Sequence, residues 1–428
     1  MGSAEINLEK HNFQWLQDFF YGQQKKRKLF EKLKSEVGVR QITALIGLRR
    51  TGKTTLLKQI IDELIRTGTE RTNILFFSFD EEQPKIEELL KNYEIKTGKN
   101  IFSSNNTIYI FLDEIQKLEN WQAQIKYFYD NYSSLKFFVS GSSSLFIQKD
   151  VRESLAGRCY EYYLGLLDFE EFLYFNDKED YLKNQKLYEE SIKKEFSMFL
   201  TRQFIEIIST NDEKVSQYAQ SVLEKVVFYD IPKVFPIEYR DLPLKLLQII
   251  ANRPGMTSDY QDLSAELNIS RTTLSNYFSY LEEAFLIKKI YNFSRNRLSS
   301  EKKMKKHYIS TTSFYSYLNP QIEEPKLIEN LVLCLCNAAF FWRTPQKQEV
   351  DFILGKNNKI LPIEVKYREN ILEKDLKHIV SFCKKFKCQS ALLITKNNQQ
   401  ERVFKGIFIK YVPAWYFALN MSEVLNRF

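Results

Sequence analysis

The sequence has few of the residues that build metal sites or disulfide frameworks. Its 428 residues include 5 cysteines and 3 histidines, and no two cysteines form a CxxC pair. A structural zinc site or a set of disulfides is therefore not expected. Free cysteines at low abundance are typical of a reducing compartment, so a cytoplasmic location is expected.

Long hydrophobic runs are also absent. The most apolar stretch, Leu331 to Trp342, is too short to span a bilayer and follows the polar pair Glu329 and Asn330. The first residues turn polar without the apolar stretch of a signal peptide, so neither export nor membrane association is expected. Residues 168–230 contain no proline or glycine, which predicts an all-helical segment.

The composition is otherwise that of a soluble globular chain, with 44% hydrophobic and 27% charged residues. Its length exceeds what one hydrophobic core supports, so about two to four domains are expected. The formal net charge of +8 favours an anionic partner such as nucleic acid.

Short apolar runs separated by helical stretches follow residue 41. These runs are the predicted strands Ile42–Ile46, Ile74–Phe79, Thr107–Leu112 and Phe137–Val139. Apolar strands that alternate with helices indicate a parallel sheet covered on both faces. Before them, residues 10–36 place aromatic side chains and the basic cluster Lys25 to Lys28 at helical spacing, which predicts an amphipathic lead-in helix or a solvated helix face.

A phosphate-binding motif follows the first predicted strand. The stretch from Gly47 to Thr54 satisfies GxxxxGK[ST] and opens a predicted helix, Thr55 to Arg66. Its glycines allow main-chain N–H groups to turn toward phosphates, and the helix adds the positive end of its dipole. The predicted nucleotide-binding residues are Gly47, Leu48, Arg49, Arg50, Thr51, Gly52, Lys53, Thr54 and Thr55. Lys53 would neutralise the β and γ phosphates of ATP, and Thr54 would ligate Mg²⁺.

An acidic pair ends the third predicted strand. Asp113 would hold the Mg²⁺ shell, and Glu114 would polarise the attacking water. The next strand ends at Ser140, which either senses the γ-phosphate or belongs to a plain Ser/Gly turn. Arg158 would act as an arginine finger on a neighbouring subunit's phosphate or within its own site, or it is an ordinary surface arginine.

Several segments, in this order, resemble AAA+ ATPases of archaea and bacteria that carry a C-terminal PD-(D/E)xK nuclease-like domain. They are Gly47–Thr54, Phe111–Gln122, Val139–Phe146, Ser154–Arg158, Leu166–Leu173, Tyr280–Ile287, Trp342–Thr344, Glu349–Leu354 and Pro362–Asn370. The resemblance implies an α/β protein with a P-loop ASCE/AAA+ parallel-sheet core, a helical lid, a winged helix and a restriction-endonuclease-like domain. One departure is Gln203 to Glu206, where such proteins carry a Gly-Gly-Phe-Pro turn.

These features predict a division into five segments. They are an N-terminal helical lead-in (1–36), the ATPase core (37–165), the lid (166–235), the winged helix (236–300) and the nuclease-like domain (301–428).

The predicted winged helix contains a helix-turn-helix. Ser270 would cap a helix from Arg271 to Phe285 that buries Leu274, Phe278 and Leu281. Side chains on its outer face would contact DNA, followed by basic residues of a wing over Ile287–Arg297. The outer-face and wing residues are Arg271, Thr272, Ser275, Asn276, Lys288, Lys289, Arg295 and Arg297. In related ATPases a winged helix also packs on the nucleotide domain, and Glu282 and Glu283 dilute the positive charge here.

The last segment carries the pattern of a nuclease centre. Asp351 lies on one predicted strand, and Glu364 and Lys366 share a face of the next, Lys359–Tyr367. Nucleases use such carboxylates to hold Mg²⁺ while the lysine steadies the nucleophile. Glu329 is a further candidate ligand. The alternative is that these are ordinary residues at the rim of a sheet.

Three functions follow. The first is an ATPase that couples nucleotide state to DNA binding. The second is a signalling switch that acts on protein partners without nucleic acid; separately, the candidate partners include a second copy of the chain in a homo-oligomer. The third is an ATP-gated, Mg²⁺-dependent nuclease.

Overall fold

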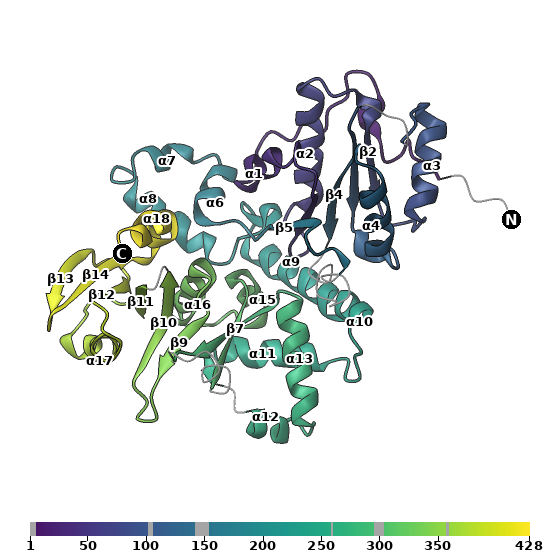
Figure 1. Cartoon of the computed structure of the whole chain (residues 1–428). Helices are drawn as coiled ribbons and strands as arrows, with labels where there is room; N and C mark the ends of the chain where they lie inside the picture. Colours follow the sequence, from purple (N-terminus) through teal and green to yellow (C-terminus); the bar gives the residue numbers. More distant parts are fainter. Residues whose placement is uncertain (1–5, 102–105, 142–153, 258–259, 295–303, 357–358) are drawn as a thin grey trace. The chain divides into compact units, whose positions relative to one another are not determined.

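The computed structural model divides the chain into two compact units, residues 1–165 and residues 166–428 (Figure 1). Each unit has its own sheet. The described residues are 6–101, 106–141, 154–257, 260–294, 304–356 and 359–428.

A parallel sheet of 5 strands, in the order β2-β3-β4-β1-β5, forms the centre of the first unit. The strands are β1 (Ile42–Ile46), β2 (Ile74–Ser78), β3 (Ile108–Asp113), β4 (Leu135–Gly141) and β5 (Cys159–Tyr163). The first four coincide with the predicted runs within two residues at each end. The edge strand β5 is not evident from the sequence, because four of its residues are not buried and no apolar run marks it.

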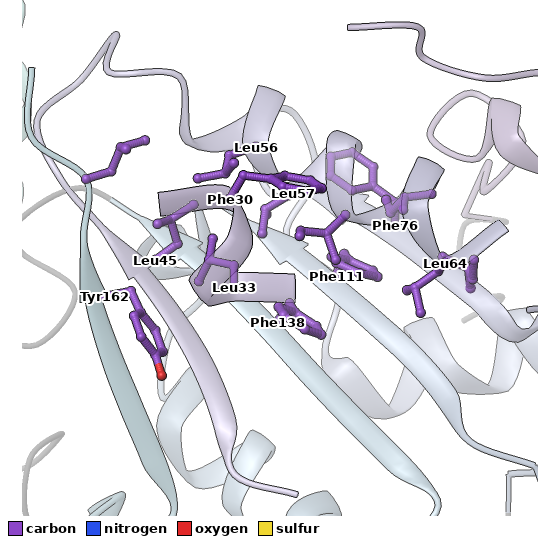
Figure 2. Packing of buried hydrophobic residues seen from close by; sticks show 14 residues of the cluster. Phe30, Leu33, Leu45, Leu56, Leu57, Leu64, Phe76, Phe111, Phe138 and Tyr162 are labelled. Atoms are coloured by element: carbon purple, nitrogen blue, oxygen red, sulfur yellow. The ribbon is translucent and has the colours of Figure 1, made fainter. Parts of the chain in front are cut away.

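Helices cover both faces of this sheet. They are α1 (Leu29–Ser35), α2 (Lys53–Arg66), α3 (Ile86–Thr97) and α4 (Trp121–Asn131). On one face, α1 and α2 contribute Phe30 and Leu57 to a buried cluster with Phe138 of β4 (Figure 2). On the other side, α3 contacts α4 (Figure 1). Burying each large apolar side chain contributes roughly 1.5–3 kcal/mol, so this cluster anchors α2 and the loop before it.

The predicted lead-in helix over residues 10–36 is largely wrong. In this region the structure has a 3-10 turn, Phe13–Trp15, and the short helix α1. The Asn12 side chain accepts a hydrogen bond from the Phe76 main-chain N–H (2.7 Å) and donates to the Phe76 carbonyl (2.9 Å). Because Asn12 occupies hydrogen-bonding groups along the edge strand β2, the chain there follows the sheet edge instead of forming a helix.

The second unit begins with helices, as the lack of proline and glycine predicts. They are α6 (Phe169–Phe175), α7 (Glu179–Lys183), α8 (Glu189–Phe199), α9 (Asp212–Lys225) and α10 (Ile231–Val234). Side-chain caps start two of them: Asp168 accepts from Glu171 N at 2.8 Å, and Asn211 accepts from Lys214 N at 3.0 Å. Each cap satisfies an N–H group that the helix itself leaves without a partner.

The remaining helices alternate with strands. The helices are α11 (Leu242–Asn252), α12 (Tyr260–Glu266), α13 (Arg271–Glu283), α15 (Tyr315–Leu318), α16 (Glu324–Cys336), α17 (Lys377–Phe386) and α18 (Ala414–Asn426). The strands are β6 (Met256–Thr257), β7 (Ile287–Asn292), β8 (Lys305–Ile309), β9 (Phe340–Arg343), β10 (Glu349–Lys356), β11 (Lys359–Lys366), β12 (Ser390–Thr395), β13 (Gln400–Phe404) and β14 (Ile407–Pro413).

These strands form one mixed sheet of 9 strands, in the order β13-β14-β12-β11-β10-β9-β7-β8-β6. Strand β7 pairs in parallel with β9 and antiparallel with β8. The predicted boundary between residues 300 and 301 therefore falls inside a single sheet. Strand β7 of the predicted wing shares main-chain hydrogen bonds with strands of the predicted nuclease-like domain, which periodicity within one segment does not reveal.

Candidate nucleotide site and C-terminal carboxylate centre

The loop from Gly47 to Gly52 has the backbone shape that a phosphate-binding loop requires. A Cβ atom on Gly47 would lie 2.3 Å from the Leu164 carbonyl oxygen, so only glycine fits there. Gly52 has φ +93° and Arg50 has φ +67°, both in the left-handed region. Helix α2 begins directly afterwards, at Lys53. Successive N–H groups at a helix start of this kind form a cradle for an anion.

Lys53 is drawn into this loop. Its side chain donates to the carbonyl oxygens of Gly47 (3.1 Å) and Leu48 (2.9 Å), and the residue is 5% exposed. Thr51 braces the same turn through a hydrogen bond from its hydroxyl to the Leu48 carbonyl at 2.9 Å. The donor set of main-chain amides and a buried ammonium suits a polyphosphate.

The N-terminal segment supplies a residue that sequence reasoning missed. Buried Arg27 donates to the Thr51 carbonyl (2.9 Å) and to the Gly165 carbonyl (3.0 Å). It thereby links the phosphate-binding loop to the chain that follows β5. The basic cluster around it looked like a solvated helix face, and only the fold distinguishes this one arginine from its neighbours.

Asp113 joins the loop to the neighbouring strands. Its carboxylate, at the end of β3 and 2% exposed, accepts a hydrogen bond from the Thr54 hydroxyl at 2.7 Å. The Ser140 hydroxyl donates to its other oxygen. Since β4 lies between β1 and β3, these three side chains meet at the carboxyl ends of adjacent strands. The predicted Mg²⁺ ligands Thr54 and Asp113 are thus in contact, and Ser140 here orients Asp113.

Glu114 is held next to this group in a left-handed backbone conformation, φ +52°. Burial raises the pKa of the Glu114 carboxyl group, and the negative charge of Asp113 raises it further. The positive charges of Lys53 and Arg49 lower this pKa, but it remains above its ordinary value. The Gln116 side-chain amide donates to Glu114 at 2.5 Å. Gln116 is a second site residue that sequence reasoning missed, because a glutamine two positions after an acidic pair carries no motif.

The structure contradicts one of the two roles predicted for Arg158. Arg158 precedes β5, and its carbonyl accepts a hydrogen bond from the N–H of Ile42 at the start of β1. The phosphate-binding loop follows the opposite end of β1, about 13 Å away for a strand of this length. The guanidinium instead pairs with Asp130 at 2.7 and 3.1 Å. A role in its own site is therefore wrong, and a role on a neighbouring subunit stays a prediction.

Helices α12 and α13 lie where the helix-turn-helix is predicted, and the winged-helix fold stays a prediction. The Ser270 hydroxyl accepts from Thr273 N at 3.0 Å and caps α13. Leu274, Phe278 and Leu281 are buried, while the predicted outer residues Arg271, Thr272, Ser275 and Asn276 are exposed. The wing lysines, however, are engaged internally: Lys289 pairs with Glu282, and Lys288 donates to Asn337 (3.1 Å) and the Cys334 carbonyl (3.3 Å). Arg295 and Arg297 lie outside the described residues.

Asp351 and Glu364 face each other across the β10–β11 pair. The strand register, Phe352 opposite Ile363, places them side by side, and Asp351 accepts from Val365 N at 2.8 Å. Lys366 pairs with one oxygen of Glu364, while the other oxygen is buried without a hydrogen-bond partner. Burial and the Asp351 charge raise the pKa of Glu364 to about 8. An unsatisfied carboxylate oxygen beside a second carboxylate is compatible with a divalent cation that keeps several waters.

Glu329, the third predicted ligand, lies near this centre, but other side chains bind its carboxylate. Its carboxylate accepts from the Tyr308 hydroxyl at 2.8 Å and pairs with Lys326 at 3.5 Å. Within the described parts of the chain, no three His, Cys, Asp or Glu side chains are grouped closely enough to hold a metal ion. The predicted three-carboxylate site is therefore not assembled in these parts of the chain, where the Tyr308 hydroxyl and the Lys326 ammonium contact the Glu329 carboxylate instead.

A buried cation of this centre was not predicted. Lys306, on β8 and 3% exposed, pairs with Glu349. Burial alone would lower the pKa of its ammonium group, but the carboxylates of Glu349, Glu329 and Asp351 raise it overall. In the sequence Lys306 belongs to an ordinary basic stretch, and it reaches the carboxylates only because β8 joins the same sheet.

Comparison with known families divides the chain into three matched regions. A model described as an AAA domain matches residues 39–173. Two models of domains of unknown function match residues 206–324 and 330–417. None of the helices in the described part of the chain has the length and apolar character needed to cross a membrane.

Similar proteins occur in archaea and bacteria. An uncharacterized protein of Methanocaldococcus jannaschii is 28% identical over 410 residues, 89% of this chain and 88% of that protein. A second uncharacterized protein of this archaeon is 30% identical over 320 residues, 67% of this chain and 64% of that protein. An uncharacterized protein of Haemophilus influenzae is 24% identical over 395 residues, 87% of this chain and 94% of that protein.

Two solved structures align with much of the chain at low similarity. The Orc1 protein of Aeropyrum pernix in complex with DNA aligns with 73% of this chain and 97% of that one, at 11% identity and a TM-score of 0.35. Cdc6p of Pyrobaculum aerophilum aligns with 70% and 94%, at 12% identity and a TM-score of 0.29. The matched AAA domain, the parallel P-loop sheet and the contact between Thr54 and Asp113 together support a P-loop domain of the AAA type over residues 39–173.

Proposed function

We propose that this protein binds and hydrolyses ATP in the first unit and couples its nucleotide state to DNA binding. The observation that carries the ATPase proposal is the 2.7 Å hydrogen bond between Thr54 and Asp113, with Glu114 next in the chain. It brings together, from helix α2 and strand β3, the hydroxyl and the carboxylate that a P-loop ATPase needs around its nucleotide.

Each residue has a distinct task in this proposal. The loop amides and Lys53 bind the β and γ phosphates, and Lys53 exchanges its two carbonyl partners for phosphate oxygens. Thr54 and Asp113 would hold Mg²⁺, which supplies charge neutralisation at the phosphates when bound. Glu114 accepts a proton from the attacking water, and Gln116 restrains the Glu114 side chain.

Replacement of Lys53 tests the phosphate site. We expect Lys53→Ala to weaken ATP binding about tenfold to a hundredfold, because charge-assisted hydrogen bonds worth roughly 1.5–3 kcal/mol are lost. The measurement is titration with a fluorescent ATP analogue in the presence of Mg²⁺. Lys91→Ala, which removes an exposed, ion-paired lysine of α3, serves as the control. If Lys53→Ala and wild type bound the ATP analogue with equal affinity, Lys53 would not belong to the phosphate site and the proposal would be wrong.

Coupling to DNA is supported by the charge balance and by α13, whose outer face carries Arg271, Thr272 and Asn276. Phosphate contacts make DNA binding strongly dependent on salt, so retention should weaken steeply between 50 and 200 mM salt. A rise in ATP turnover on addition of a protein partner, with no response to DNA, would instead indicate the signalling switch.

A Mg²⁺-dependent nuclease is the second candidate, favoured by the unsatisfied Glu364 oxygen beside Asp351 and Lys366. In that case Asp351→Ala and Lys366→Ala abolish DNA cleavage, because the cation and the nucleophile lose their supports. ATP hydrolysis stays intact in both variants. Gel assays with Mg²⁺ and plasmid DNA measure cleavage, and equal cleavage by wild type and both variants would refute this candidate.

A further inference from the structure

The outer face of α17 carries a row of exposed lysines. Lys377, Lys384 and Lys385 are seven and eight residues apart, so they lie on one side of the helix. Lys374 in the preceding turn and Lys387 after the helix are also exposed. The opposite side of α17 is apolar and packs on the sheet through Ile379, Phe382 and Cys383. The lysines are therefore presented by a helix that its own core holds in place.

These lysines have no acidic partner within the described parts of the chain. Nearby basic residues do: Arg402 pairs with Glu373 at 2.6 Å, Arg368 with Asp375 at 2.5 Å, and Lys396 with Glu369 at 3.7 Å. The acidic side chains around α17 are thus used by other cations. The lysine row keeps its full positive charge, which is the condition for attracting an external anion.

The predicted winged helix has less positive charge to offer. Lys288 and Lys289 of its wing are engaged internally, and Glu282 and Glu283 end α13. Among the described residues on the outer face of α13, Arg271 carries the positive charge. Electrostatic attraction for a polyanion is therefore stronger at α17 than at α13.

The α17 row also adjoins the carboxylate centre. The His378 side chain, in the first turn of α17, accepts a hydrogen bond from the main-chain N–H of Glu349 at 3.5 Å. Glu349 in turn pairs with Lys306 of that centre. Helix α17 therefore packs against the strands that carry Glu349, Asp351 and Glu364.

We infer that the lysine face of α17 binds the phosphate backbone of duplex DNA, independently of sequence. The inference rests on the DNA coupling proposed above, and it identifies the lysine face of α17 as the surface that binds the DNA. Lysines contact phosphates and carry no base preference. Single-strand binding surfaces add exposed aromatic side chains for base stacking, whereas Phe382 of α17 is buried and the outer face carries lysines.

A charge-matched comparison tests the inference. One full-length variant combines Lys374→Gln, Lys377→Gln and Lys384→Gln; the control combines Lys91→Gln, Lys183→Gln and Lys193→Gln, which are ion-paired elsewhere. Both variants have the same net charge. Binding to a short fluorescein-labelled duplex of mixed sequence is followed by anisotropy at several salt concentrations. The α17 variant should bind roughly tenfold or more weakly, and its log–log salt slope should fall by up to about 2.7, or about 0.9 for each phosphate that a lysine no longer neutralises.

Several outcomes would overturn the inference. They are equal weakening of binding in both variants, weakening confined to an Arg271→Gln variant, a preference for single strands, or no duplex binding by wild type. ATP hydrolysis and thermal unfolding of each variant, measured in parallel, show that it is folded. They also separate the two proposals, because hydrolysis that depends on Lys53 supports the ATPase whatever happens at α17.

Discussion

Glu114→Gln is expected to lower the turnover number for ATP hydrolysis by about 10²- to 10⁴-fold while leaving ATP affinity within a few-fold of wild type. The amide keeps the shape of the side chain, and its oxygen still accepts the hydrogen bond that Gln116 donates at 2.5 Å. What it lacks is the ability to take a proton from the attacking water. Phosphate release under steady-state conditions measures turnover, and titration with a fluorescent ATP analogue measures binding.

The matched control for this prediction is Glu119→Gln. Glu119 lies five residues further along the same segment and is exposed, so its replacement should leave turnover within about twofold. If Glu114→Gln hydrolysed ATP as fast as wild type, Glu114 could not be the general base. Another group near Asp113 would then have to accept the proton of the attacking water. If affinity and turnover fell together, Glu114 would support the loop and not the chemical step.

Lys306→Met is expected to lower the free energy of unfolding by up to about 3–5 kcal/mol, because the half-buried carboxylates of Glu349, Glu329 and Asp351 lose a buried cation. Lys306 is 3% exposed and pairs with Glu349, and its charge also acts on Glu329 and Asp351. Methionine keeps most of the side-chain volume, so the destabilisation would be electrostatic and would include loss of the cation–π contact between the Lys306 ammonium and the Phe341 ring. Urea unfolding at neutral pH, followed by circular dichroism, measures it.

Lys326→Met provides the comparison, because Lys326 pairs with Glu329 from the exposed side, at 3.5 Å. A surface pair of this kind is worth about 0–1 kcal/mol. The direction of the pH dependence follows from the raised pKa of Lys306. Its stabilising contribution is complete below the unfolded-state value of 10.5 and is lost as the pH rises through the higher folded-state value. Equal stability of Lys306→Met and wild type would show that the centre does not need this cation.

The two units differ in how directly their sites follow from the sequence. In the first unit the motif residues Lys53, Thr54 and Asp113 are where the pattern predicts them, since each closely follows or ends a buried strand. In the second unit Asp351 and Glu364 are paired as predicted, whereas Glu329 is held by Tyr308. A strand pair with a short connection is encoded locally, but the partner of a helix side chain is not.

Elements with local causes could be predicted from the residues alone: the phosphate-binding loop and the strand before it, the Ser270 cap of α13, and the helices after residue 166. Four features emerge only in the folded chain: β7 pairs with β9, Lys306 pairs with Glu349, Arg27 donates a hydrogen bond to the phosphate-binding loop, and Arg158 lies at the opposite end of β1 from that loop. The reason is physical. Caps, turns and hydrophobic periodicity act between residues a few positions apart, whereas strand pairing and buried ion pairs join residues whose separation along the chain leaves no repeating pattern.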